Sequence, residues 1–115
     1  MRPETALQIE MLAELRRHGV EPVAVPNGAV LAGNGKQRAI QMNSLKKQGL
    51  KVGFPDLVTL MPFGKVGFIE VKCEGEKLTE KQSEVHEWLI AKGHLVVVCR
   101  SIQDVRDTMV EWGMA

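Results

Sequence analysis

The sequence predicts an α/β fold in which a central mixed β-sheet is flanked by helices. Segments with helical periodicity alternate with short apolar segments rich in Val and Ile, and two apolar segments follow one another across a connection that contains Pro and Gly. The expected order is α-β-α-β-β-α-β-α, without an internal repeat or a linker. A chain of 115 residues is expected to fold as a single domain over residues 1–115.

The N-terminal part is expected to form a helix, a strand and a loop. Pro3 near a first helical position, an apolar stripe and Gly19 as a stop indicate a helix over about residues 4–18. VEPVAV (20–25) is typical of a strand. NGAVLAGNG (27–35) is rich in Gly and Asn, which indicates a loop.

The middle of the chain is expected to form a short helix and a hairpin. KQRAIQMNSLKKQG (36–49) favours a basic helix that ends at Gly49. DLVTLM (56–61) and VGFIEVKC (66–73) are joined by PFGK, a pattern that is typical of a β-hairpin.

The C-terminal part is expected to form a helix, a strand and a second helix. Thr79 is a good N-cap with Gln82 three residues later, and Gly93 indicates the end of that helix. The continuous apolar run HLVVVC (94–99) is typical of a strand covered on both faces. Ser101 is the expected N-cap of the last helix.

Composition narrows the classes of function. A content of 25% charged and 44% hydrophobic residues, with a net charge of +1, fits neither a disordered tail nor a strongly basic nucleic-acid coat. No apolar run approaches the ~20 residues that cross a bilayer, and the start lacks a secretory signal, so a cytoplasmic protein without a membrane partner is expected. Cys73 and Cys99 lack the spacing of zinc ligands, so buried reduced thiols are expected.

Two acids and a lysine interrupt the apolar hairpin. If residue 61 pairs with residue 66 across PFGK, Asp56 lies opposite the region that begins at Glu70. Because side chains alternate along a strand, Glu70 and Lys72 share one face and leave the other to the core. One face of the second strand is therefore expected to carry chemistry.

Two neighbouring carboxylates repel each other, and a divalent cation between them removes that repulsion. Mg²⁺ or Mn²⁺ prefers such oxygen ligands, supplemented by a backbone carbonyl, water and substrate phosphate. Lys72 could orient or deprotonate the attacking water, or stabilise charge on a phosphate, which indicates phosphodiester hydrolysis. In the alternative interpretation, Asp56 caps a turn, and Glu70 and Lys72 form the solvated face of an edge hairpin.

The hairpin residues resemble the PD-(D/E)xK nuclease signature. A wider pattern, which extends from the first helix to Ser101, resembles the VRR-NUC family, whose members share the restriction-endonuclease-like fold. The resemblance rests on PD at Pro55 and Asp56, G-x-P-D-L at 53–57, E-V-K at 70–72, L-T-E-K-Q at 78–82 and VVVCRS at 96–101.

The resemblance implies roles for the hairpin residues. Asp56 and Glu70 are expected to bind Mg²⁺ or Mn²⁺, with the carbonyl of Val71 as a third ligand, and Lys72 matches the catalytic lysine. A nuclease of this kind is expected to be a metal-dependent endodeoxyribonuclease.

The resemblance also implies roles for two polar positions on helices. Family members tend to carry an acid in the first helix followed one turn later by Gln; Glu4 with Gln8 matches, and Glu10 is the rival for that metal-binding acid. Glu4 is alternatively an acid that stabilises a first helical turn. Gln82 matches the glutamine that follows ExK and is expected in the active site, although Thr79 and Gln82 also form a capping box.

A carboxylate-rich site repels a phosphate backbone, so positive charge is needed nearby. Five basic residues lie within sixteen residues that contain no acid. They are candidates for phosphate contacts, and the alternative is an ordinary solvated helix face. The five are Lys36, Arg38, Lys46, Lys47 and Lys51.

The aromatic, His and Met residues are expected to stabilise the fold or to lie at the surface, and not to take part in catalysis. The chain has no Tyr and few other aromatics, so base stacking is a weak expectation and recognition is expected to follow DNA shape and backbone. Trp88 and Trp112 are expected in the core or a dimer interface. Three histidines without ligand spacing are expected at the surface or at helix ends, and three methionines in the core. These are His18, His86, His94, Met42, Met61 and Met109.

Small members of the family resemble Holliday junction resolvases. The resemblance implies a homodimer that cuts Holliday junctions or other branched DNA, because a two-fold axis presents two sites to a symmetric junction. A role in DNA repair or recombination and a phage origin would suit such a chain. The alternatives are a DNA-binding module of the same fold without turnover, and a nuclease of different preference such as a sequence-specific restriction enzyme.

Overall fold

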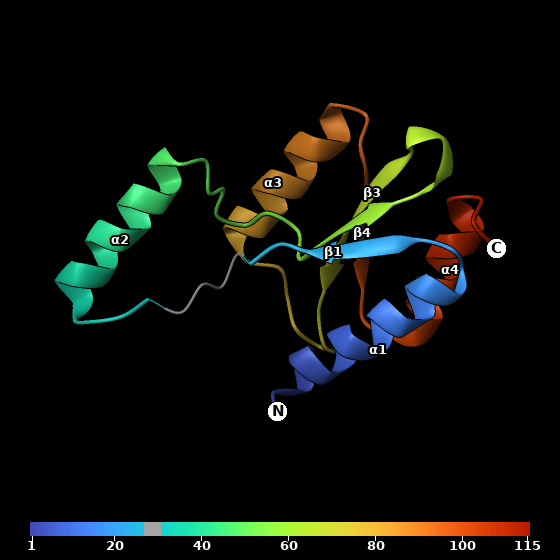
Figure 1. Cartoon of the computed structure of the whole chain (residues 1–115), viewed down its shortest axis with the longest axis horizontal. Helices are drawn as coiled ribbons and strands as arrows, with labels where there is room; N and C mark the ends of the chain where they lie inside the picture. Colours follow the sequence, from blue (N-terminus) through green and yellow to red (C-terminus); the bar gives the residue numbers. More distant parts are fainter. Residues whose placement is uncertain (27–30) are drawn as a thin grey trace.

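The computed structural model describes residues 1–26 and 31–115 (Figure 1). Its elements follow the predicted order, with a short 3₁₀ turn added inside the hairpin. They are α1 (Pro3–Arg17), β1 (Glu21–Ala24), α2 (Gly35–Lys47), β2 (Leu57–Leu60), η1 (Pro62–Gly64), β3 (Val66–Val71), α3 (Glu80–Ala91), β4 (Leu95–Cys99) and α4 (Ile102–Glu111). Of the loop predicted over 27–35, the first four residues lie outside the described part of the chain.

The described strands form one mixed sheet in the order β1-β2-β3-β4. β2 is antiparallel to both β1 and β3, whereas β4 runs parallel to β3 after the α3 crossover. The hairpin was predicted correctly, but its register differs by one residue, because Leu60 rather than Met61 pairs with Val66. Met61 instead donates its backbone N–H to the carbonyl of Lys65, so the connection between the strands is one residue longer than predicted.

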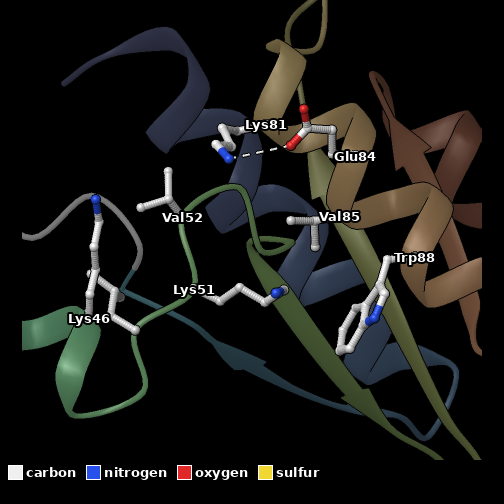
Figure 2. A pocket seen from close by; sticks show the side chains of 8 residues that line it. Lys46, Lys51, Val52, Lys81, Glu84, Val85 and Trp88 are labelled. Carbon is white, nitrogen blue, oxygen red and sulfur yellow. Dashed lines mark ion pairs between the residues drawn. The ribbon is translucent and has the colours of Figure 1, made fainter.

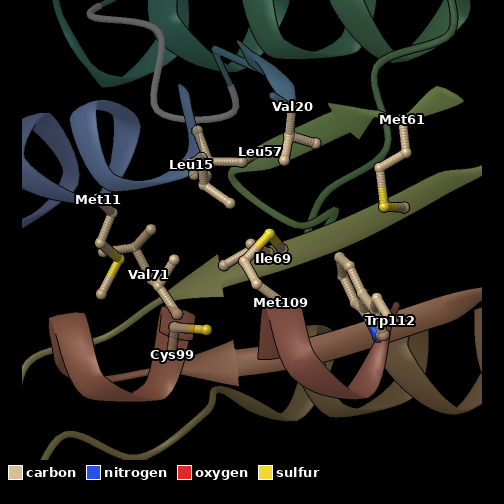
Figure 3. Close-up of a cluster of buried hydrophobic side chains, with 11 residues drawn as sticks. Met11, Leu15, Val20, Leu57, Met61, Ile69, Val71, Cys99, Met109 and Trp112 are labelled. Carbon is tan, nitrogen blue, oxygen red and sulfur yellow. The ribbon is translucent and has the colours of Figure 1, made fainter. Parts of the chain in front are cut away.

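The apolar core lies between the sheet and the helices α1 and α4 (Figure 3). At its centre Ile69 and Leu57 are fully buried, as are Met11 of α1 and Met109 of α4. Trp112 closes one end of the core against Gly67, where a Cβ atom would lie 2.4 Å from the indole ring. Trp112, Met61 and Met109 therefore occupy the core as predicted.

The opposite face of the sheet is covered by α3, which packs against β4. α3 begins at the predicted capping box, in which the Thr79 hydroxyl accepts from the Gln82 N–H and the Gln82 side chain accepts from the Thr79 N–H. Val85 and Leu89 face the sheet, whereas Ile90 is 57% exposed. β4 forms one border of the sheet, and its residues are mostly half-buried. It packs against α3 on one face and α4 on the other, so the prediction of a strand covered on both faces is confirmed.

α2 stands apart from the rest of the fold (Figure 1). Asn34 caps its N-terminus through a box with Gln37, so the helix is stabilised locally. No residue of α2 is buried, and Ile40 is 60% exposed. Met42 is only half-buried, so its predicted place in the core was wrong.

Within residues 1–26 and 31–115, no helix is both long and apolar enough to span a membrane.

Candidate active site

Asp56 is positioned by the turn that leads into β2. Gly53 belongs to this turn and packs against the first turn of α3. It has a φ of +86°, and a Cβ atom there would lie 2.6 Å from the carbonyl oxygen of Lys81. Only glycine fits this turn without strain. The Asp56 carboxylate then accepts a 2.8 Å hydrogen bond from the backbone N–H of Val71 on β3. This bond holds the first acid beside the E-V-K segment.

Glu70 is buried, at 1% exposure, on the face of β3 that α3 covers. Burial and the neighbouring Asp56 carboxylate raise the pKa of Glu70 to about 9, while the charge of Lys72 acts in the opposite direction. The alternative of a solvated hairpin face is therefore wrong. Two adjoining carboxylates, one of them deprived of water, form an arrangement that favours an added cation.

His86 is the partner of Glu70 that the sequence did not reveal. Its Nε2 lies 3.0 Å from Oε1 of Glu70, and the histidine is 7% exposed. Burial lowers the pKa of His86, an effect that Asp56 opposes and Lys72 reinforces. The prediction that His86 lies at the surface was wrong, whereas His18 and His94 do lie at helix ends. The i, i+4 spacing of Gln82 and His86 on α3 was the available signal.

Lys72 and Glu4 complete the charged neighbourhood. Lys72 is 8% exposed, an unusual burial for lysine that its acidic surroundings explain. Burial raises the pKa of Glu4, and the charges of Glu76 and Asp56 add to the effect, which locates Glu4 near the hairpin acids. Glu4 and Glu76 line a cleft of about 530 Å³ between the start of α1 and the loop after β3. Glu10 lies elsewhere, beside a cavity of about 300 Å³ near α4.

Gln82 is held by its capping box at the start of α3. Its Oε1 accepts from the Thr79 N–H at 2.9 Å, and its own backbone N–H donates to Oγ1 of Thr79 at 3.1 Å. The capping interpretation is therefore present in the structure. Glu70 and His86 fix the same helix against the sheet one turn further on.

Arg100 secures the loop that borders the cleft. Its guanidinium donates to the carbonyl oxygens of Cys73 (3.0 Å) and Glu76. Its backbone N–H donates to the Asp104 carboxylate at 2.8 Å, which joins the end of β4 to α4. Arg100 lies in the segment VVVCRS (96–101) of the family pattern, but nothing in the sequence indicated its role.

The predicted basic residues lie on α2 or, for Lys51, on the segment that joins α2 to β2. All five are exposed. Lys46 and Lys51 line a groove between the end of α2 and α3, whereas Lys36 and Arg38 are at the other end of the helix. Trp88 borders the same groove and is 46% exposed, so of its two predicted places the core is wrong and a dimer interface stays a prediction.

The donor set of the site fits a hard divalent cation. Asp56, just before β2, and Glu70, on β3, supply carboxylate oxygens. The carbonyl of Val71 and the carboxylate of Glu4 are further oxygen donors in the same region. The described residues contain no preformed group of three or more His, Cys, Asp or Glu side chains around one point. A metal here would thus depend on two side chains plus backbone, water or substrate oxygens.

The fold and site define an α/β protein that holds two carboxylates and a lysine on a hairpin covered by a helix. The model of the VRR-NUC domain matches residues 28–103, about two thirds of the chain. The chain therefore belongs to the VRR-NUC domain family.

Solved structures of VRR-NUC domains have the same fold as this chain. Two solved structures, named as a VRR_NUC domain and a VRR_NUC domain protein, share the fold. The first has a TM-score of 0.65 at 24% identity over 94% of both chains. The second has a TM-score of 0.70 at 20% identity over 97% of this chain and 88% of that one.

A curated phage protein is similar over a shorter region. This is p44 of Acyrthosiphon pisum secondary endosymbiont phage 1, whose name proposes that it is a nuclease. The two are 45% identical over 49 residues, which are 43% of this chain and 53% of p44. The match thus spans about half the length of the curated relative.

Proposed function

We propose that the protein is a metal-dependent endonuclease that hydrolyses phosphodiester bonds in branched DNA. The observation that carries the proposal is the convergence of Asp56, Glu70 and Lys72 at one end of the β2–β3 hairpin. Burying these charges costs stability, so a structural role alone gives little reason for them. Membership of the VRR-NUC family supports the same chemistry.

Asp56 and Glu70 are the proposed ligands of Mg²⁺ or Mn²⁺, with the Val71 carbonyl as third ligand and Glu4 as an outer acid. When bound, the metal would supply charge stabilisation at the phosphate and raise the acidity of water. The hydrogen bond from the Val71 N–H fixes the Asp56 carboxylate, which reduces the reorganisation needed on binding. His86 fixes the carboxylate of Glu70 in the same way.

Lys72 is the proposed catalytic lysine, and Gln82 a polar residue at the edge of the site. Water attacks phosphorus, a P–O ester bond breaks, and the leaving oxygen takes up a proton. Buried beside acids, the ammonium of Lys72 is placed to stabilise charge that develops on the phosphate. Because Oε1 of Gln82 is engaged at Thr79, its amide N–H₂ is the group left to contact substrate.

The basic segment is the proposed DNA-binding surface. Five exposed cations within sixteen acid-free residues offer phosphate contacts that the acidic site itself does not. α2 projects from the body of the protein, which allows it to reach along a duplex arm (Figure 1). The cations are Lys36, Arg38, Lys46, Lys47 and Lys51.

The protein is proposed to act as a homodimer on four-way or other branched junctions. A two-fold axis would present two identical sites to the two symmetric strands of a junction. The exposed apolar side chain of Ile40 on α2 is available for contacts with a second copy.

Cleavage of a substrate panel tests this function. Labelled duplex, flap, splayed-arm and four-way substrates are incubated with Mg²⁺, Mn²⁺ or EDTA, and light scattering gives the mass of the protein in solution. Paired symmetric nicks on the junction, dependent on metal and on Glu70, are expected from a dimer. DNA binding without metal-dependent cleavage by the unmodified protein would instead identify a DNA-binding module.

A further inference from the structure

A groove of about 540 Å³ lies between α3 and the segment that joins α2 to β2 (Figure 2). On α3, Lys81, Glu84, Val85 and Trp88 line it at the i, i+3, i+4 and i+7 spacing of one helical face. Gln82 and His86 occupy the neighbouring face. α3 therefore has one side toward the catalytic acids and another toward the groove.

The groove combines an exposed aromatic ring with positive charge. Trp88 is 46% exposed although most of its neighbours on the sheet side of α3 are buried. The ammonium nitrogens of Lys51 and Lys92 lie 4.5 Å and 5.1 Å from the centre of its indole ring. Figure 2 shows Lys51 extended toward Trp88 from the segment opposite α3.

The charge of the groove favours an anion. Lys46 comes from the last turn of α2 and Lys51 from the segment after it, and both are exposed. The acid of the groove, Glu84, forms an ion pair with Lys81 at 3.4 Å, so its repulsion of a phosphate is offset. The lining thus carries three lysines and one acid around an aromatic surface.

We propose that this groove binds an unstacked nucleotide of the DNA substrate, with its base on the indole of Trp88 and its phosphates on Lys51 and Lys46. Stacking tolerates any base because every base has a π-face. A base that displaces Lys51 from the ring frees this flexible ammonium to contact the adjoining phosphate. The groove therefore suits single-stranded nucleic acid near a branch point rather than continuous duplex.

The groove is close enough to the acids for one strand to occupy both. Lys51 precedes Asp56 by five positions, so their Cα atoms are at most about 17 Å apart. Because this separation is an upper limit, a short stretch of one strand can reach from the groove to the acids. The inference rests on the proposed function and specifies the substrate as DNA with an unpaired nucleotide within that distance of the cut.

Tryptophan fluorescence tests the stacking directly. The protein is titrated with a single-stranded oligothymidylate in EDTA, which prevents metal-dependent cleavage. Quenching of the parent protein is expected, and Trp88→Ala is expected to lose it although Trp112 remains in the core. The affinity of Trp88→Ala should fall about tenfold. Ile90→Ala, which removes another exposed apolar side chain from α3, should bind as the parent does.

Salt dependence tests the phosphate contacts. Lys51→Ala and Lys46→Ala are each expected to lower the slope of log affinity against log salt by about 0.7 for a single strand. Arg16→Ala, which removes an exposed positive charge from α1, is expected to leave that slope unchanged. Equal slopes for the three variants and the parent would overturn the phosphate assignment.

Two results would overturn the stacking site. One is parent-like affinity and quenching in Trp88→Ala. The other is conversion of a dimer to a monomer by Trp88→Ala, measured by light scattering, which would make this surface a subunit contact. Failure of the groove is distinguishable from failure of the proposed function. Metal-dependent cleavage that persists without Trp88-dependent binding refutes only the groove, and Trp88-dependent binding without cleavage refutes only the nuclease.

Discussion

The two faces of β3 are both buried, yet they bury opposite kinds of side chain. Toward α1 and α4, Ile69 and Val71 are fully buried in an apolar cluster. Toward α3, Glu70 and Lys72 are almost as inaccessible, at 1% and 8% exposure, and carry ionisable groups. The first face gains free energy from removal of apolar surface from water, whereas the second gives up hydration.

This difference separates the part of the hairpin that stabilises the fold from the part proposed for chemistry. The positive charge of Lys72 compensates only partly for the lost hydration, since burial and the neighbouring Asp56 carboxylate still raise the pKa of Glu70 to about 9. Substitutions on the apolar face should therefore affect stability, and substitutions on the charged face should affect cleavage.

The largest effect is expected from neutralising the charged face. Glu70→Gln keeps the size of the side chain but weakens the proposed metal site, so cleavage should fall about 1,000-fold or more, because several kcal/mol of charge stabilisation is lost. Asp56→Asn and Lys72→Met should act in the same direction. The measurement is single-turnover cleavage of a four-way junction in Mn²⁺. Unchanged rates in all three variants would contradict the proposed site.

Ile69→Ala should affect stability instead of chemistry. Removal of this fully buried side chain is expected to lower the free energy of unfolding by about 2–5 kcal/mol. Glu70→Gln on the adjacent position should be as stable as the parent or more stable at pH 8, because it no longer buries an ionisable acid. Urea unfolding in EDTA compares the two, and equal losses would show that the faces are not distinct.

A substitution of His86 should affect both cleavage and stability. His86→Leu keeps an apolar volume under α3 but removes the contact with Oε1 of Glu70, so cleavage should fall about 10–100-fold. His86→Gln, which can still donate a hydrogen bond, should retain more activity. The measurement is the Mn²⁺ concentration that gives half-maximal cleavage. A shift of this concentration in His86→Leu would indicate altered metal binding. An unchanged concentration together with a loss of thermal stability would indicate that His86 acts only through packing.

The pH dependence of stability sharpens the comparison further. In metal-free protein the pKa of Glu70 is raised from 4.5 to about 9, so its contribution to stability is fully present below pH 4.5 and is lost as pH rises toward 9. The expected slope is about 1 kcal/mol per pH unit within that window. Urea unfolding at several pH values gives this slope. Glu70→Gln should be less sensitive to pH, and an identical profile would contradict the raised pKa.

The smallest effect is expected at the helix that covers the charged face. Thr79→Ala removes the side-chain acceptor for the Gln82 N–H and should cost about 1 kcal/mol of stability. Thr79→Ser keeps the hydroxyl and serves as the control. If Gln82 acts through the cap alone, cleavage under saturating conditions should not change with Thr79→Ala. A loss of activity at unchanged stability would support a direct role for Gln82.

Local patterns predicted most of the architecture. The capping box of Thr79 and Gln82, the N-cap at Ser101 and the hairpin follow from residues close to one another in the chain, so they could be found without the tertiary structure. The register error arose because PFGK was treated as the whole connection. Phe63 adopts a left-handed conformation with φ of 62°, and this turn closes between Met61 and Lys65.

The candidate site was predicted only as far as its strand residues. Alternation along β3 places Glu70 and Lys72 together, but it does not indicate what lies above them. His86 and Trp88 are two residues apart on α3, and one proved buried while the other proved exposed. Their helix has polar and apolar residues on several faces, so periodicity did not identify the inner face.

The sequence by itself determined the order of elements, the N-caps of α3 and α4 and the presence of two acids and a lysine on one hairpin. These features depend on backbone preferences and on periods of a few residues. Only the tertiary structure decided that α3 covers the charged face, that His86 contacts Glu70 and that α2 lies outside the core. These outcomes depend on contacts between segments distant in the chain, whose free energies local sequence does not contain.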